Sequence, residues 1–188
     1  MSTELSFEEE GRKKLVEGIT KLSRAVKSTL GPRGKTVLIE SQLHTHGITI
    51  TKDGVTVAKS ISLADPVENL AVKILKEAAD RTATSAGDGT TTAIVLTEAM
   101  VTRGNEFITE RNNPTEVLRN VNTVVDGVVK SLEKMSKKVS GKTLKDVASI
   151  SANNDKELGA IIADAYNKVG KDGIVTVENS QTDRTYSE

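Results

Sequence analysis

The stretch Gly87-Asp88-Gly89-Thr90-Thr91-Thr92 leads directly into an apolar segment that continues to Phe107. Glycines let the backbone approach a ligand closely, and the N–H groups and positive dipole end of a helix favour an anion at that point. Because a carboxylate in the same turn repels phosphate, we interpret Asp88 as a ligand of Mg2+ that lies between it and the phosphates. The alternative is a helix N-terminus whose role is only structural.

Helices are predicted on both sides of this stretch. Residues 66–85 carry a broad apolar stripe at helical spacing, and Gly87 ends that helix. A second helix, at residues 91–107, is expected to be buried because its apolar residues leave little polar face. These residues are Ala93, Ile94, Val95, Leu96, Ala99, Met100 and Val101.

The turn Thr29-Leu30-Gly31-Pro32-Arg33-Gly34-Lys35-Thr36 follows another predicted helix, which runs to about residue 30. The buried stripe of that helix is expected to be Leu15, Ile19, Leu22 and Val26. Although Gly-Lys-Thr ends the turn as it ends a P-loop, a P-loop runs from a strand into a helix, and here the predicted order is reversed. A P-loop phosphotransferase is therefore disfavoured. We interpret the turn as a helix end that presents backbone groups to a nucleotide, with a purely structural helix stop as the alternative.

The stretch Thr51-Lys52-Asp53-Gly54 ends the second of two predicted strands, at residues 36–39 and 48–51. Its lysine is suited to offset phosphate charge, and its aspartate to orient a water molecule or hold a cation. The alternative is an Asp-Gly hairpin turn. Residues 55–61, which follow, are ambiguous.

A long helix is predicted from Asn113 to about Met135. Asn113, Pro114 and Glu116 supply an N-cap, a proline in the first turn and a capping-box acid. The buried stripe of this helix is expected to be Val117, Val121, Val124, Val128, Leu132 and Met135.

The composition changes beyond Ser136 to lysine, serine and glycine, which indicates a domain boundary. Two shorter helices, at residues 143–149 and 155–169, are predicted before a turn and a strand at residues 174–178. Because the chain then ends on a polar segment after a strand with no obvious partner, we expect a truncated chain.

Composition excludes several classes of protein. Lysine plus arginine (26) balances aspartate plus glutamate (26), which argues against a protein that mainly grips nucleic acid, and there is no cysteine for a disulfide framework or a thiolate metal site. The polar, acidic N-terminus resembles neither a signal peptide nor a transit peptide, so a cytoplasmic protein without a membrane span is expected. His44 and His46 are expected to be solvated rather than to bind a metal.

Several motifs in order along the chain resemble the N-terminal third of a group I chaperonin subunit. They are Thr-Leu-Gly-Pro-Arg-Gly from Thr29, Ile-Thr-Lys-Asp-Gly from Ile50, Gly-Asp-Gly-Thr-Thr-Thr-Ala from Gly87, Ile150-Ser151-Ala152-Asn153 and Val169-Gly170-Lys171-Asp172-Gly173. The resemblance covers essentially the whole chain. At Lys52 the sequence resembles group I chaperonins, because archaeal and eukaryotic cytosolic chaperonins usually have asparagine at this position. A bacterial or phage origin is therefore expected.

Two segments depart from the family pattern, residues 44–47 and residues 179–188. Both lie away from the expected phosphates, so they bear on subunit contacts and lineage more than on ATP binding.

The resemblance implies roles for individual residues. Asp53 would be catalytic and place the attacking water, and Asp88 would ligate Mg2+. A monovalent cation, normally K+, would lie near Thr29, Lys52 and Thr90. The residues expected to contact ATP are Thr29, Leu30, Gly31, Pro32, Lys52, Gly54, Gly89, Thr90, Thr91, Thr92, Ile150 and Ser151.

The resemblance also implies a mainly α fold with short β strands. Residues 1–135 would be the N-terminal segment of an equatorial ATP-binding domain, and residues 136–188 the outgoing half of an α/β intermediate hinge domain, with apical and returning segments absent. Identical subunits would form a ring, usually seven-fold, that uses ATP hydrolysis to encapsulate unfolded client proteins, with a possible co-chaperonin lid. The isolated chain would show little ATPase activity, since the second catalytic aspartate of the family lies on the returning segment. The alternative is a non-catalytic helical assembly module.

Overall fold

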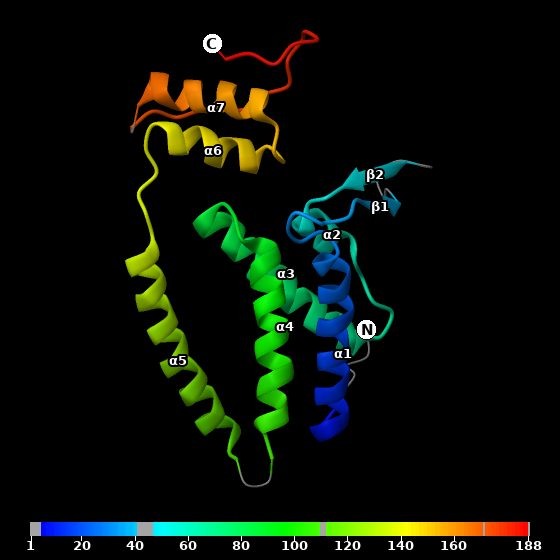
Figure 1. Cartoon of the computed structure of the whole chain (residues 1–188). Helices are drawn as coiled ribbons and strands as arrows, with labels where there is room; N and C mark the ends of the chain where they lie inside the picture. The colour runs from blue at the N-terminus through cyan, green and yellow to red at the C-terminus, as the bar shows by residue number, and fades with distance from the viewer. Residues whose placement is uncertain (1–4, 41–46, 110–111, 171, 188) are drawn as a thin grey trace. The chain divides into compact units, whose positions relative to one another are not determined.

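The structure, a computed structural model, describes residues 5–40, 47–109, 112–170 and 172–187. These residues are mainly helical with one short sheet, which confirms the predicted fold class (Figure 1). The chain divides into two compact units, Met1–Val124 and Val125–Glu188. None of the described helices is long and apolar enough to cross a membrane.

Helices and a hairpin make up the first unit. The elements that lie wholly within it are α1 (Glu8–Lys27), β1 (Val37–Glu40), β2 (Ile48–Thr51), α2 (Gly54–Ser60), α3 (Pro66–Ala86) and α4 (Thr90–Phe107). Helix α1 packs against both α3 and α4, and the short α2 lies against α1 and α3 (Figure 1). Helix α2 includes most of the segment at residues 55–61, whose sequence pattern is ambiguous.

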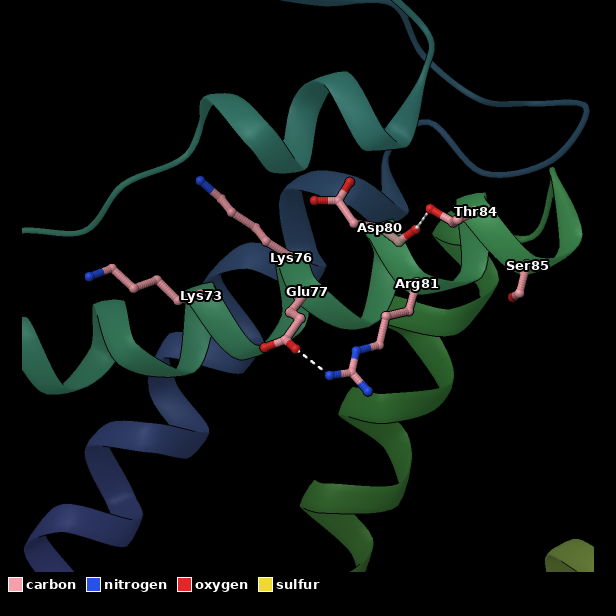
Figure 2. A pocket seen from close by; sticks show the side chains of 7 residues that line it. All are labelled: Lys73, Lys76, Glu77, Asp80, Arg81, Thr84 and Ser85. Atoms are coloured by element: carbon pink, nitrogen blue, oxygen red, sulfur yellow. Dashed lines mark hydrogen bonds and ion pairs between the residues drawn. The ribbon is translucent and has the colours of Figure 1, made fainter.

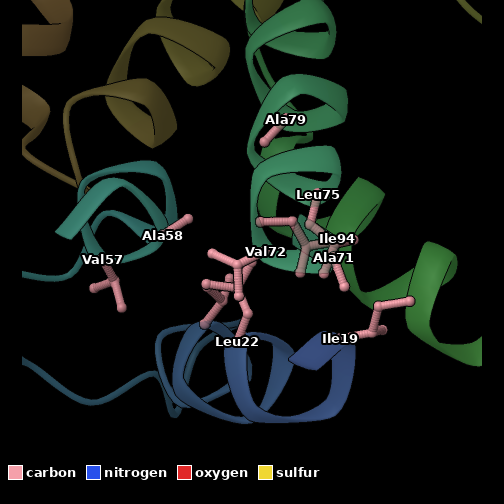
Figure 3. Close-up of a cluster of buried hydrophobic side chains, with 10 residues drawn as sticks. Ile19, Leu22, Val57, Ala58, Ala71, Val72, Leu75, Ala79 and Ile94 are labelled. Atoms are coloured by element: carbon pink, nitrogen blue, oxygen red, sulfur yellow. The ribbon is translucent and has the colours of Figure 1, made fainter. Parts of the chain in front are cut away.

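The core of this unit is made by one face from each of the four helices. Leu22, Val72, Leu75 and Ile94 are at most 1% exposed and point toward one another, as Figure 3 shows. Burial of such side chains stabilises a fold by about 1.5–3 kcal/mol each. These contacts hold together the helices whose ends lead into the predicted ligand segments.

Helix α4 is less buried than predicted. Ile94 is its only buried residue, while Leu96 and Met100 are 53% and 47% exposed. The expectation of a buried helix was wrong because α1 and α3 cover only the face that contains Ile94, and the apolar residues continue around the helix.

Helix α1 crosses α3 at a very short distance. A Cβ on Gly18 would lie 2.3 Å from the carbonyl oxygen of Glu68, closer than real Cβ contacts occur. Beside this crossing, Lys21 Nζ lies 2.5 Å from Glu68 Oε1 and 2.6 Å from Oε2. The hydrogen bond with Glu68 is the main reason why the pKa of Lys21 is raised. Glycine at residue 18 thus lets the two backbones meet.

The two strands form an antiparallel pair in which Leu38 faces Ile50. Val37 and Ile39 turn to the core, whereas Leu38 and Ile50 are exposed on the other face. The loop that contains His44 and His46 lies outside the described residues.

Helix α5 (Pro114–Met135) begins as predicted, but no residue in it is buried. Val117 and Val121 are half-buried, and Leu132 and Met135 are 57% and 73% exposed. The predicted apolar stripe is present in the sequence, yet the described residues do not cover it.

In the second unit, α6 (Lys142–Ser151) and α7 (Lys156–Val169) pack as a helical hairpin. A Cβ on Gly159 would lie 2.2 Å from Ser149 Oγ, so this glycine is required for the close contact. The strand predicted at residues 174–178 does not form: this segment has no regular structure, and Ile174 and Val177 are 85% and 92% exposed. The reason is that a strand needs a neighbour for its backbone hydrogen bonds, and no described segment pairs with this one.

Candidate nucleotide-binding site

Two of the predicted ligand segments meet at Gly54, the first residue of α2, beside the last turn of α1. A Cβ on Gly54 would lie 2.1 Å from Thr91 Oγ1 and 3.2 Å from Val26 Cγ1. Val26 belongs to the last turn of α1, and Thr91 to the first turn of α4. The end of α1, the start of α2 and the start of α4 therefore come together in space, although they are far apart in the sequence.

The turn after α1 is closed by its own hydrogen bonds. The Lys35 N–H donates to the Ser28 carbonyl at 2.7 Å, and the Gly34 N–H donates to the Gly31 carbonyl at 2.9 Å. Thr29 Oγ1 donates to the Val26 carbonyl at 2.8 Å, and Gly31 has a φ of +74°. The turn leaves Leu30, Gly31 and Pro32 exposed. A helix precedes this turn and β1 follows it, the reverse of a P-loop, as predicted.

Asp53 is the N-cap of α2 and not part of a hairpin turn. Its Oδ1 accepts from the Val55 N–H at 3.3 Å, and its Oδ2 accepts from the Thr56 N–H at 2.9 Å and the Thr56 hydroxyl at 2.6 Å. Burial, the largest single effect, raises the pKa of Asp53, but the hydrogen bonds from Thr56 and Val55 together hold it below its ordinary value. The carboxylate is thus ionised at neutral pH and fixed in direction. Lys52, next to it, is exposed.

The stretch from Gly87 to Thr92 forms a tight connection between α3 and α4. Gly87 ends α3 with a φ of +73°, and Gly89, with a φ of +86°, is the N-cap of α4. A glycine has no side chain with which to cap a helix, and no side chain caps α4. The N–H groups at Thr90, Thr91 and Thr92 are thus in a position to bind an anion.

Asp88 lies between the two glycines and is exposed. Its Oδ1 accepts a hydrogen bond from the Gly89 N–H at 2.6 Å. No group of three or more His, Asp or Glu side chains suited to a metal occurs among the described residues. A metal ion at Asp88 would therefore depend on phosphate oxygens and water for its other ligands, which is the usual way in which proteins bind Mg2+.

Ile150 and Ser151 lie in the last turn of α6, in the other compact unit, and both are exposed.

An open pocket on α3 contains none of the predicted site residues. Figure 2 shows its lining residues, Lys73, Lys76, Glu77, Asp80, Arg81, Thr84 and Ser85. Most of the charged side chains among them are paired. Arg81 Nη2 lies 2.6 Å from Glu77 Oε1, and Asp80 Oδ1 lies 2.9 Å from Nζ of Lys59 in α2. Lys76 Nζ donates to the Lys59 carbonyl at 2.9 Å, and burial lowers its pKa. This surface fastens α2 to α3 and is not a candidate ligand site.

Sequence reasoning missed two contacts beside the site. The Thr56 hydroxyl that orients Asp53 had a local signal, because a side chain three residues after an N-cap often contacts it. The ion pair between Lys27 and Glu98 has no local signal in the sequence, since the two residues lie 71 positions apart.

Comparison with known proteins finds a matching family model and similar solved structures. Residues 22–186 match the TCP-1/cpn60 chaperonin family. Two crystal forms of the chaperonin gp146 from the bacteriophage EL 2 (Pseudomonas aeruginosa), crystallised in the presence of ATP-BeFx, are 32% identical, with TM-scores of 0.73 and 0.74 over 85% and 86% of this chain. A group III chaperonin in the open state is 26% identical, with a TM-score of 0.69 over 85% of this chain. The chain spans 28% of the phage proteins and 32% of the group III protein.

Proposed function

The chain belongs to the TCP-1/cpn60 chaperonin family, and from this premise we propose that it is the ATP-binding part of a chaperonin subunit. The observation that carries the proposal is the contact of Gly54 with Thr91 and Val26. It brings together the end of α1, after which the closed turn begins, the ionised carboxylate next to Gly54 in the sequence, and a helix N-terminus without a side-chain cap. The matched phage chaperonin was crystallised with ATP-BeFx, which supports the same ligand class here.

Mg-ATP would bind with its phosphates at the first turn of α4. The N–H groups and hydroxyls of Thr90, Thr91 and Thr92 are the proposed donors, and Gly89 allows the backbone to come close. Asp88 would ligate the Mg2+, which when bound neutralises phosphate charge. Thr29 and the exposed residues Leu30, Gly31 and Pro32 of the turn, together with Gly54, would line the nucleotide.

Asp53 is the proposed catalytic residue. Because its pKa is lowered, it is a carboxylate at neutral pH, able to accept a hydrogen bond from the attacking water and hold it in line. The hydrogen bond from Thr56 fixes the direction of that carboxylate. Thr29, Lys52 and Thr90 would lie near a K+ ion.

Further properties of the whole protein belong to the same proposal. Residues 1–135 would be part of the equatorial domain, and residues 136–188, which include Ile150 and Ser151, part of the intermediate domain. Identical subunits would form a ring in the cytoplasm that uses ATP hydrolysis to fold enclosed client proteins, with a possible co-chaperonin. Lys52 favours group I.

The proposal is tested by NMR on the 15N-labelled chain titrated with Mg-ATP. We expect the amide signals of Gly31, Gly54 and Thr90–Thr92 to shift, and the same signals to stay in place with Mg2+ alone. A control titration with ATP and excess EDTA is expected to give smaller shifts, because the metal bridge to Asp88 is lost. Unchanged signals for the first turn of α4 at millimolar Mg-ATP would contradict the proposal and favour a non-catalytic assembly module.

A further inference from the structure

An ion pair joins the last residue of α1 to the middle of α4. Lys27 Nζ donates to Glu98 Oε2, and the Glu98 side chain is only 14% exposed, against 42% for Lys27. A carboxylate this far removed from solvent is costly without a partner, so Lys27 is needed to balance it. Lys14 and Lys21, which also belong to α1, form ion pairs with Asp65 and Glu68 on the α3 side.

Glu98 lies on the same face of α4 as Thr91, one of the proposed phosphate ligands. Thr91, Ile94 and Glu98 are spaced three and four residues apart, which places them on one side of a helix. Thr91 contacts Gly54, and Ile94 is fully buried in the core. This face therefore touches α2 at its start, the core at its centre and α1 through Glu98.

Lys27 is directly followed by the closed turn. The Ser28 carbonyl accepts from the Lys35 N–H, and a Cβ on Gly34 would lie 2.2 Å from the Thr29 carbonyl oxygen. The turn is thus packed on itself and held at its base by the end of α1. A shift of that end relative to α4 would move the whole turn relative to Thr91.

We infer that the Lys27–Glu98 ion pair is a positioning contact that sets the distance between the turn at residues 29–32 and the first turn of α4. The inference rests on the proposed function, because these are the two surfaces between which ATP would bind. Neither Lys27 nor Glu98 touches the nucleotide. Loss of the pair lowers ATP affinity because a displacement of about 1 Å is enough to weaken several contacts at once.

The test compares dissociation constants for Mg-ATP, measured by isothermal titration calorimetry, with melting temperatures of the same samples. Lys27→Met keeps the length of the side chain and removes its charge, and we expect it to raise the dissociation constant roughly tenfold. The exchanged pair Lys27→Glu with Glu98→Lys is expected to return the constant to within about threefold of the original value. Lys21→Met is the matched control, because it removes an ion pair from the same helix on the α3 side; it should lower the melting temperature with less than about a twofold change in the constant.

Each outcome separates this inference from the function on which it rests. No binding of Mg-ATP by the unaltered chain overturns the proposed function and the inference with it. Binding by the unaltered chain with no loss in Lys27→Met, or with an equal loss in Lys21→Met, overturns the inference alone. If Lys27→Met does not fold, Glu98→Gln takes its place, because glutamine retains an acceptor for Lys27; a smaller rise in the constant at a nearly unchanged melting temperature supports the inference, and an unchanged constant rejects it.

Discussion

Gly54 and Thr91 are in such close contact that a Cβ on the glycine would lie 2.1 Å from the threonine Oγ1. The first turn of α2 and the first turn of α4 therefore have no room for a side chain between them. This contact places Asp53, which precedes Gly54, next to the helix start at which phosphate is proposed to bind.

Gly54→Ala is expected to destabilise the chain by about 1–3 kcal/mol, because the new methyl group must push α2 and α4 apart. Chemical denaturation measures this loss. Gly104→Ala in α4 is the control: its Cβ meets no atom within 4 Å, so alanine there is expected to stabilise the helix by about 0.5–1 kcal/mol. Combining Gly54→Ala with Thr91→Ala should recover part of the stability, and no recovery would mean that the threonine is not the obstacle.

Asp88→Ala is expected to weaken Mg-ATP binding by roughly tenfold or more, because the phosphates lose their metal bridge to the protein. The effect should be largest at limiting Mg2+. Calorimetric titration with ATP at several Mg2+ concentrations measures it. Since Asp88 is exposed, the melting temperature without nucleotide should hardly change, and equal affinities for both proteins at low Mg2+ would reject the metal-ligand role.

Asp53→Asn separates the two roles of this residue. Asparagine caps a helix about as well as aspartate, so α2 should persist. Without the carboxylate charge, we expect the single-turnover rate of ATP hydrolysis by the complete subunit to fall by about 10²–10⁴-fold, with a much smaller change in ATP affinity. Asp53→Ala should in addition lower stability by about 1 kcal/mol. An unchanged rate in Asp53→Asn would show that the attacking water is placed by another group.

The stability of the chain in acid should depend on Asp65. Its Oδ1 accepts hydrogen bonds from the Glu68 and Val67 N–H groups at the start of α3, and its Oδ2 lies 3.1 Å from Lys14 Nζ. The hydrogen bond from the Glu68 N–H is the largest of the effects that lower its pKa. Because the pKa is lower in the folded chain than in the unfolded chain, the ionised group stabilises the fold above the ordinary pKa, and that contribution disappears as the pH falls through the lowered value.

Asp65→Asn keeps the cap and removes the titration. We therefore expect it to be less stable than the original chain at neutral pH and to lose less stability between about pH 6 and about pH 3. Urea unfolding across this range measures the difference. Parallel curves for the two proteins would contradict the assignment.

Replacement of an apolar residue in α5 should have little effect on the stability of this chain. Leu132 is 57% exposed, whereas Leu22 of α1 is fully buried. We expect Leu132→Ala to change the free energy of unfolding by about 0.5 kcal/mol or less, and Leu22→Ala to lower it by about 2–5 kcal/mol. Equal losses would show that α5 is covered in solution.

The limits of α3 could be predicted because all its signals are local. Asp65 caps its start, Pro66 fits the first turn, and Gly87 ends it in a left-handed conformation. The short α2 could not be predicted in the same way, because seven residues are too few to show a clear helical period. The strand expected at residues 174–178 depends on a neighbour, which no local pattern reveals.

Burial was predicted less well than helix position. The apolar residues of α4 and α5 were identified correctly, but whether such a face is covered depends on what packs against it. Ile94 is covered by α1 and α3, while Leu96 and Leu132 are not covered. Periodicity alone gives the direction of a face and not its partner.

The motifs of the candidate site were visible because glycine, threonine and aspartate have distinct chemistry in short segments. Their convergence was not visible from spacing. Gly54 meets Thr91, and Lys27 meets Glu98, only because the core holds α1, α2 and α4 in a particular arrangement. The individual roles in ATP binding stay predictions.

The close crossing at Gly18 also has an evolutionary consequence. Helix α3 has 21 residues, about 30 Å in length, and it begins near Gly18 and ends at the connection that contains Asp88. A helix of this kind is stiff, so it behaves as a lever: lifting its first turn to make room for a side chain at residue 18 would displace its last turn as well. We expect related sequences that lose the glycine at residue 18 to carry compensating changes around residues 87–89, so that substitutions at the two ends of α3 are inherited together.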